Sequence, residues 1–211
     1  MIFVCGNCGM TNCFTVEGDL QVCKNCGNRR KIRKGRLLLL IGPQGAGKTA
    51  VSEALQRKTA WLVLEGDILR PSGLPSWRKE RQYLKTWLKI CTEAAQTVDT
   101  VVLCGNWSPT MIASCSELSY FFEPVLVVLF PSLRFMTENQ EKRPSYRKVS
   151  RLLLIRQLHR RLDRRRYLRT DAFRGTVLRL DQPLGSPEDT ADCIISKMAR
   201  TKTDRPDERG D

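Results

Sequence analysis

A glycine-rich stretch, GPQGAGKT, occupies residues 42–49 between an apolar run and a segment with the composition of a helix. Its spacing is GxxxxGK[ST], the pattern of a loop that joins a strand to a helix and surrounds phosphate groups. Backbone N–H groups and the helix N-terminus attract phosphate oxygens, Lys48 would reach the β- and γ-phosphates, and the Thr49 hydroxyl would hold Mg²⁺. We therefore expect this loop to bind a nucleoside triphosphate. The residues expected to contact it are Gly42, Gln44, Gly45, Ala46, Gly47, Lys48 and Thr49.

Two acidic side chains end the next apolar segment, LEGD, at Glu65 and Asp67. The third and fourth apolar segments end in LCGN and LFPS, so neither supplies the acid that motor ATPases place at the end of a strand. A carboxylate at the carboxyl end of a parallel strand lies on the ligand-binding side of the sheet. Asp67 is therefore a candidate to accept a proton from an acceptor hydroxyl or to orient that hydroxyl, the alternative being a surface turn residue. One residue separates the two acids, so only one of them is expected to face the site.

Two arginines in the sequence RPSYR, Arg143 and Arg147, lie four residues apart with Pro144 between them. The proline opposes a continuous helix, so we expect a loop here, after a helix over 132–142. A loop with two guanidinium groups can close over a triphosphate and stabilise the charge of a transition state. The alternative is a pair of ordinary surface arginines.

Four of the nine cysteines form the pattern CxxC-x14-CxxC. They are Cys5, Cys8, Cys23 and Cys26. Two CxxC turns aim four thiolates at one ion and complete a closed, structural zinc site, with an iron–sulfur centre or two disulfides as the alternative. Because so short a segment buries little core, the Zn²⁺ would supply its folding energy. We expect a zinc ribbon over 1–30, in which Cys13 is a spare, followed by a basic and solvated linker over 31–36.

The formal net charge of +14 is concentrated in two segments. Residues 1–36 carry 7 Lys or Arg against 2 Asp or Glu, and residues 134–179 carry 15 against 4. This distribution favours polyanionic partners, from nucleotides to nucleic acid, or else a solvated basic surface. No apolar run is long enough to cross a bilayer, and the N-terminus lacks the pattern of a secretory signal. We therefore expect a cytoplasmic protein without a membrane partner.

Five short apolar segments alternate with segments of helical length, a pattern typical of a parallel sheet covered by helices on both faces. The expected strands are 36–42, 60–67, 100–106, 124–131 and 176–181. The expected helices are 47–58, 76–97, 109–120, 132–142, 148–168 and a last one that begins at Ser186 and Pro187. Serine is favoured as a helix cap and proline at the first helical position. We expect this α/β unit over 37–200 and a disordered tail over 201–211.

Residues 36–200 resemble the small P-loop kinases, which include nucleoside and nucleotide kinases, gluconate- and shikimate-type kinases, chloramphenicol phosphotransferase and the kinase domain of polynucleotide kinase. The matching sequences are GPQGAGKT, LEGD, VVLCGNWSP, LVVLFPSLRFMTENQEKRPSYR and LRLDQPLGSPEDT. The resemblance implies a P-loop NTPase three-layer sandwich with five parallel strands in the order 2-3-1-4-5. It also implies transfer of a phosphoryl group from ATP, with Mg²⁺, to a hydroxyl or a phosphate. Asp67 would be the base or acceptor-orienting residue, Arg143 and Arg147 the lid arginines, and Gln182 a neighbour of the adenine.

Two features depart from that family. A four-Cys module is not part of the family core, and the arginine pairs with which nucleoside-monophosphate kinases hold an acceptor phosphate are not evident. Arg70, Arg78 and Arg81 follow the second strand and are the nearest substitutes.

The resemblance places the acceptor pocket after the second strand and at the end of the third. Trp77, Tyr83 and Trp107 are candidates to stack on a base or sugar, although aromatic residues also pack commonly in helical cores. Asn106 is a candidate to hydrogen-bond an acceptor hydroxyl. The substrate-contacting residues expected here are Asp67, Arg70, Trp77, Asn106 and Trp107.

Three functions fit these patterns. The favoured one is a kinase that phosphorylates a hydroxyl of a small molecule, with a nucleoside or nucleotide-like acceptor. The second is a polynucleotide 5′-hydroxyl kinase acting on RNA or DNA, which the charge distribution and the zinc ribbon favour. The third is an NTP-binding regulatory module whose zinc ribbon docks a partner protein.

Overall fold

The computed structural model describes residues 3–68, 77–142, 169–180 and 185–200. The predicted site residues Arg70, Arg143, Arg147 and Gln182 lie outside these ranges, as do the helix predicted over 148–168 and the tail. Trp77 begins a described helix, but its side chain lies outside the description. None of the described helices has both the length and the apolar character needed to span a membrane.

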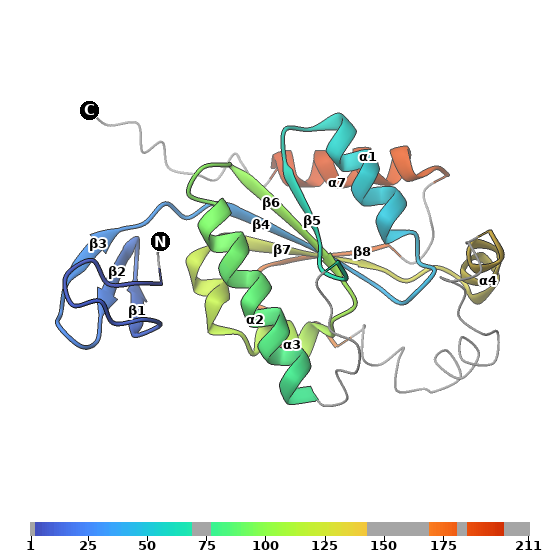
Figure 1. Cartoon of the computed structure of the whole chain (residues 1–211). Helices are drawn as coiled ribbons and strands as arrows, with labels where there is room; N and C mark the ends of the chain where they lie inside the picture. The colour runs from blue at the N-terminus through green and yellow to red at the C-terminus, as the bar shows by residue number, and fades with distance from the viewer. Residues whose placement is uncertain (1–2, 69–76, 143–168, 181–184, 201–211) are drawn as a thin grey trace.

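Five parallel strands form the central sheet (Figure 1). They are β4 (Arg36–Ile41), β5 (Leu62–Glu65), β6 (Thr100–Gly105), β7 (Phe122–Leu129) and β8 (Thr176–Leu180). Their order in the sheet, β5-β6-β4-β7-β8, confirms the predicted order 2-3-1-4-5. The most apolar segment became the central strand because a strand covered on both faces buries every side chain.

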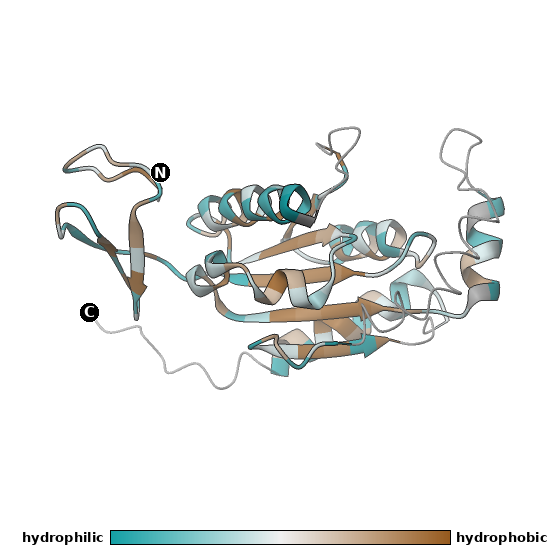
Figure 2. Cartoon of the chain, turned by 90° about the horizontal axis from the view of Figure 1, so that it is seen from below, coloured by the Kyte–Doolittle hydropathy of each residue, from teal (hydrophilic) through white to brown (hydrophobic). Residues whose placement is uncertain are grey.

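Helices cover both faces of this sheet, which makes a three-layer sandwich. One face carries α1 (Lys48–Lys58) and α7 (Pro187–Arg200), and the other carries α2 (Trp77–Ala94), α3 (Pro109–Ala113) and the 3₁₀ helix η1 (Ser116–Tyr120). Alternate side chains of β4 pack into the helical layers on opposite faces of the sheet. Leu38 and Leu40 pack with the first pair of helices, and Leu37, Leu39 and Ile41 pack with the second group. Figure 2 shows the resulting apolar strands between helices with polar outer faces.

The predicted element boundaries are close to the observed ones, with one difference. The helix expected over 109–120 is interrupted: α3 ends at Ala113, and Cys115, at φ −92° and ψ 117°, is extended before η1 begins. Buried contacts of the Cys115 side chain hold this kink inside the apolar cluster. The predicted cap of α7 is present, because the Asp189 amide donates to Ser186 Oγ at 3.1 Å and the Ser186 amide donates to the Asp189 carboxylate at 2.8 Å.

A small antiparallel sheet precedes the sandwich, with strands β1 (Phe14–Glu17), β2 (Leu20–Cys23) and β3 (Arg29–Lys31). We call residues 3–31 the ribbon. Strand β4 starts beside the ribbon and ends at the glycine-rich loop, so the two lie at opposite ends of the central sheet (Figure 1).

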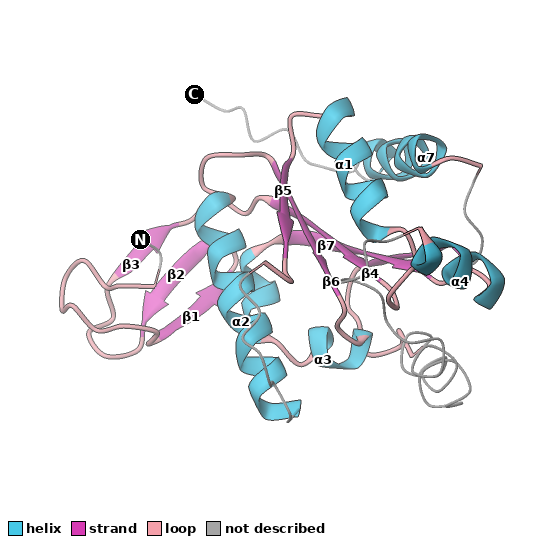
Figure 3. Cartoon of the chain, turned by 45° about the vertical axis from the view of Figure 1, so that its right-hand side comes forward, coloured by secondary structure: helices cyan, strands magenta, loops and turns pink. Residues whose placement is uncertain are grey.

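The ribbon lies beside α2 (Figure 3) and also contacts Tyr120 of η1. The rings of Phe3 and Tyr120 have centroids 5.3 Å apart, and Gln21 Nε2 donates to the Tyr120 hydroxyl at 3.1 Å. Lys89 of α2 donates to Asn12 Oδ1 at 2.5 Å, with its ammonium 5.3 Å from the Phe3 ring centroid. The ribbon is therefore docked on the sandwich by both apolar and polar contacts.

The segment expected to be a solvated linker is part of this docking instead. Ile32 is only 4% exposed and belongs to the apolar cluster of the sandwich. Arg33 pairs with Asp99, and its backbone amide donates to Gln96 Oε1 at 3.2 Å. A composition rich in basic residues concealed these contacts, because one apolar side chain among six residues gives no periodic signal.

Candidate active site

The glycine-rich loop links the end of β4 to the start of α1 and is folded as a phosphate loop. Gly47 has φ 87°, a conformation that favours glycine, and a Cβ on Gly42 would lie 2.3 Å from the carbonyl oxygen of Leu129. Lys48 Nζ donates to the carbonyl oxygens of Gly42, at 2.8 Å, and Pro43, at 3.0 Å. These bonds hold the ammonium group inside the curve of the loop. Thr49, in the first turn of α1, is exposed, and its role as a Mg²⁺ ligand stays a prediction.

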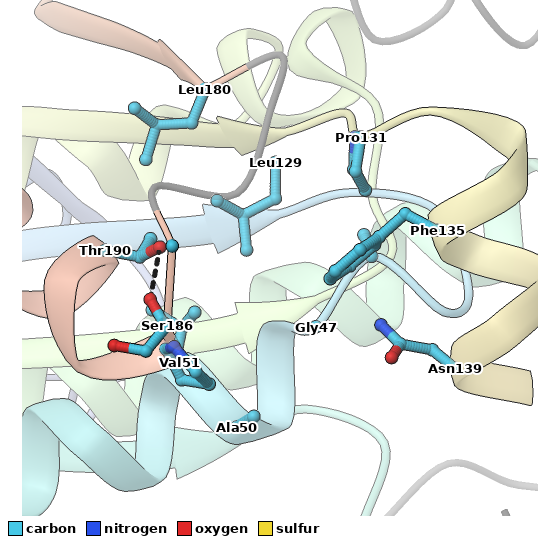
Figure 4. A pocket seen from close by; sticks show the side chains of 13 residues that line it. Gly47, Ala50, Val51, Leu129, Pro131, Phe135, Asn139, Leu180, Ser186 and Thr190 are labelled. Atoms are coloured by element: carbon cyan, nitrogen blue, oxygen red, sulfur yellow. Dashed lines mark hydrogen bonds between the residues drawn. The ribbon is translucent and has the colours of Figure 1, made fainter. Parts of the chain in front are cut away.

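A cavity of about 200 Å³ opens beside this loop (Figure 4). Its apolar walls come from the loop, α1, the end of β7, α4 (Leu133–Glu141) and the end of β8. These walls include Ala46, Val51, Leu129, Pro131, Phe135 and Leu180. A mainly apolar cavity that adjoins a phosphate loop is a candidate site for a nucleobase. Leu180 and Gly185, the residues on either side of the segment 181–184, both line the cavity. Gln182, which was predicted to lie near the adenine, belongs to that segment and stays a prediction.

Helix α4 contacts the loop directly. Asn139 Nδ2 donates to the Gly45 carbonyl oxygen at 3.1 Å, and the Phe135 ring lies beside Gly47. The sequence predicted the helix but not this contact, because the two bonded residues are 94 positions apart. The contact ties the helix that precedes the predicted arginine loop to the phosphate loop.

Glu65, at the carboxyl end of β5, reaches the other side of α1. The Ser52 hydroxyl lies 2.5 Å from Glu65 Oε1 and 2.9 Å from the Thr49 carbonyl oxygen. Burial raises the pKa of the Cys104 thiol beneath them, and the charge of Glu65 raises it further while that of Lys48 lowers it. Both charges therefore lie close to one buried group. Sequence reasoning placed an acid here without assigning it a role, because its partner Ser52 lies on another element.

Asp67 has different surroundings, as its spacing from Glu65 predicts. Its side chain is exposed, and it follows Gly66, whose backbone N–H and C=O are both hydrogen-bonded. The Gly66 amide donates to the Cys104 carbonyl oxygen at 2.7 Å, and the Tyr83 hydroxyl donates to the Gly66 carbonyl oxygen. Asn106, half-buried after β6, follows the strand next to β5. The structure thus places Asp67 and Asn106 after the ends of neighbouring strands, where ligands bind in such sheets.

The aromatic residues near this point are packed in the core. Trp107 is 5% exposed and lies against Gly66 and Gly105, where a Cβ would meet its ring at 2.3 Å and 2.1 Å. The Tyr83 ring lies 6.4 Å from that of Trp107 and 6.3 Å, edge-on, from that of Trp87. These rings pack against one another, and stacking of Trp107 on an acceptor stays a prediction.

One arginine considered for an acceptor phosphate has another partner. The Arg81 guanidinium donates to the Ser114 hydroxyl at 2.9 Å and to the Ser114 carbonyl oxygen at 2.6 Å. It therefore braces α2 against the end of α3. Arg78, one turn earlier, is exposed.

The four paired cysteines meet in one cluster, with all four sulfur atoms within 4.8 Å of one another. The Sγ atoms of Cys5 and Cys26 lie 3.6 Å apart, and those of Cys8 and Cys23 lie 3.7 Å apart. Sulfurs bound to one tetrahedral zinc at about 2.3 Å would be about 3.8 Å apart, so the spacing fits this ion. Backbone amides of Cys8 and Asn7 lower the pKa of the Cys5 thiol to about 6, whereas the pKa of Cys23, although the Cys26 backbone amide lowers it, is raised to about 11 by burial and by the thiols of Cys5 and Cys8.

No protein-family model matches the sequence, and no match is found among curated proteins. Solved structures do resemble it. An unliganded sugar kinase from Janibacter sp. HTCC2649 has a TM-score of 0.61 at 18% identity, over 78% of this chain and 95% of that one. A gluconokinase from Sinorhizobium meliloti 1021 has a TM-score of 0.55 at 21% identity, over 82% and 98%. A shikimate kinase from Acinetobacter baumannii, in complex with shikimate, has a TM-score of 0.53 at 18% identity, over 81% and 96%. The chain therefore has the α/β fold of the P-loop kinases, with a five-stranded parallel sheet.

Proposed function

We propose that the protein is an ATP- and Mg²⁺-dependent kinase that transfers the γ-phosphoryl group to a hydroxyl of a small molecule. The observation that carries this proposal is the pair of acids that flank Gly66, one bonded to the phosphate-loop helix and the other exposed beyond the strand end. A protein that only binds nucleotide needs only the phosphate loop. Transfer to a hydroxyl also releases the hydroxyl proton, which a carboxylate near the phosphate loop can accept.

The described residues divide the work as follows. The loop amides and Lys48 bind the phosphates, and the apolar cavity takes the base. The Thr49 hydroxyl and the Glu65 carboxylate supply the oxygen ligands that Mg²⁺ prefers, either directly or through water. Bound Mg²⁺ neutralises charge on the β- and γ-phosphates.

Asp67 acts on the acceptor. As the acceptor oxygen bonds to the γ-phosphorus, the bond to the bridging oxygen of ADP breaks and Asp67 takes the hydroxyl proton. Asn106 orients the hydroxyl. In this proposal Arg143 and Arg147 stabilise the transferring group, as their sequence context predicts.

The acceptor that we propose carries a sugar-type hydroxyl, either in a nucleoside or nucleotide-like molecule or in a free polyol. Asp67 and Asn106 are hydroxyl-binding groups, and Arg81 is engaged with Ser114 rather than arranged as a phosphate clamp. Kinases of comparable fold act on shikimate and gluconate by their names, which adds hydroxy acids to the compounds worth testing.

We further propose that Cys5, Cys8, Cys23 and Cys26 hold one structural Zn²⁺. Four thiolates leave no open coordination position, so this ion would stabilise the ribbon and take no part in the reaction.

The test is ADP release with ATP and Mg²⁺ against adenosine and other nucleosides, nucleoside monophosphates, D-gluconate, shikimate, aminoglycosides and 5′-hydroxyl oligonucleotides. Asp67→Asn should abolish stimulation by the acceptor, whereas Asp171→Asn, at another exposed aspartate, should not. Stimulation by oligonucleotides alone would favour a polynucleotide kinase. ATP binding without stimulation by any compound would favour a regulatory module.

A further inference from the structure

Three contacts fix the backbone of Gly66. Its N–H extends the pairing of β5 with β6 by donating to Cys104, and its carbonyl oxygen accepts the hydroxyl hydrogen of Tyr83. The third restraint is Trp107, whose ring occupies the space where a side chain would begin. Any other residue at position 66 would displace this ring, so the close packing itself requires glycine.

Gly66 separates the two candidate acids. A rotation of the Gly66–Asp67 peptide group, which carries the Gly66 carbonyl oxygen, would change the direction of Asp67, whereas Glu65 is held separately by Ser52. The direction of Asp67 therefore depends on what holds the Gly66 carbonyl oxygen. A displacement of about 1 Å in a group that acts on the substrate can lower the reaction rate about 100-fold.

The packing of Tyr83 suits it to hold the Gly66 carbonyl oxygen in place. It lies in α2, an 18-residue helix, and its ring is held between Trp87 and Trp107. The two rings restrict the side-chain torsions of Tyr83, which keeps its hydroxyl in one position. The described structure gives the Tyr83 hydroxyl a backbone partner within the site, so this side chain acts through Gly66 rather than by stacking on an acceptor.

We infer that Tyr83 is a positioning residue for phosphoryl transfer, which fixes the direction of Asp67 through the Gly66 carbonyl group. This inference rests on the proposed function for its catalytic consequence, but its structural part is independent of it. Tyr83→Phe keeps the ring and removes only the hydroxyl. Tyr120→Phe is the matched control, because it removes a buried tyrosine hydroxyl that bonds Gln21 at the ribbon, at the other end of the sheet.

The first measurement is amide hydrogen exchange by mass spectrometry of the full-length chain over residues 62–68. We expect Tyr83→Phe to speed exchange within this segment several-fold, because the Gly66–Asp67 peptide group loses its anchor, and Tyr120→Phe to leave it unchanged. Equal exchange in Tyr83→Phe and the wild type would overturn the inference, whatever the protein catalyses.

The second measurement is steady-state kinetics with ATP and adenosine, D-gluconate or shikimate as the acceptor. Tyr83→Phe should lower kcat/KM for the acceptor about tenfold while leaving the KM for ATP unchanged. A merely structural role would lower kcat/KM for the acceptor, raise the KM for ATP and lower the thermal midpoint together, and would contradict the inference. If the wild type turned over none of these acceptors, the proposed function would fail for them, and the exchange measurement would still decide whether Tyr83 holds Gly66.

Discussion

The Ser52 hydroxyl lies 2.5 Å from a carboxylate oxygen of Glu65, which joins the phosphate-loop helix to the end of the edge strand β5. Strand β6 lies between β5 and β4, the strand that leads into the phosphate loop. The Glu65 side chain nevertheless reaches the phosphate-loop helix through Ser52. The contact places a negative charge one helical turn from Thr49, where Mg²⁺ would be bound.

Replacing Glu65 tests this arrangement. Glu65→Gln keeps the shape and removes the charge, so we expect a fall in kcat of about 10- to 100-fold and a higher Mg²⁺ concentration for half-maximal activity. Glu53→Gln, at an exposed glutamate of α1, is the control and should behave as the wild type. Identical Mg²⁺ titrations for Glu65→Gln and the wild type would contradict a role for this acid.

Removing the contact between α4 and the phosphate loop should weaken nucleotide binding. Asn139→Ala deletes the bond to the Gly45 carbonyl oxygen, and the loss of one such bond predicts a roughly threefold to tenfold rise in the dissociation constant of ATP. Isothermal titration calorimetry measures it directly. Glu138→Ala, at the preceding residue, disturbs only an exposed pair with Arg134 and should leave the affinity as it is.

Loss of the cysteine cluster should destabilise more than the ribbon. Cys8→Ser removes one of the four sulfurs, and because Phe3 and Asn12 contact Lys89 of α2, unfolding of the ribbon exposes that helix. We expect one zinc per chain in the wild type, little in Cys8→Ser, and a thermal midpoint lower by at least about 5 °C.

Cys13→Ser is the matched control for this prediction. Cys13 lies between the two pairs but outside the cluster, so its loss should change neither the metal content nor the midpoint. Full zinc content in Cys8→Ser, measured by mass spectrometry, would show that the metal site is assigned wrongly.

The start of α7 gives a pH-dependent contribution to stability. The backbone amide and then the hydroxyl of Ser186 bond the Asp189 carboxylate and hold its pKa below the ordinary value. A lowered pKa in the folded state means that the stabilisation is present above the unfolded-state value and is lost as the pH falls through the folded-state value. Asp189→Asn should therefore lower the thermal midpoint at pH 7, and the difference from the wild type should vanish in acid. A difference that is the same at both pH values would contradict this origin.

The sequence predicted the features that depend on local chemistry. The phosphate loop, the Ser186 cap and the meeting of two CxxC pairs follow from spacing, and the strand order follows from the resemblance to P-loop kinases carried by GPQGAGKT and LEGD. Runs of apolar residues sufficed to place the strands, because buried parallel strands tolerate little else.

What the sequence did not predict depends on contacts between distant elements. Nothing local indicates that Ser52 would bond Glu65, that Asn139 would bond Gly45, or that Ile32 would enter the core from a basic segment. Core packing of Trp107 was the alternative considered from the sequence, but its close approach to Gly66 and Gly105 was not predicted, because the two glycines are distant in the chain.

The most direct test of the central claim follows the label from [γ-³²P]ATP. The wild type, with Mg²⁺ and the most stimulating acceptor of the panel, should place the label on that acceptor, and Asp67→Asn should not. Label found only in inorganic phosphate, or transfer that persists undiminished in Asp67→Asn, would contradict a kinase in which Asp67 activates the acceptor hydroxyl.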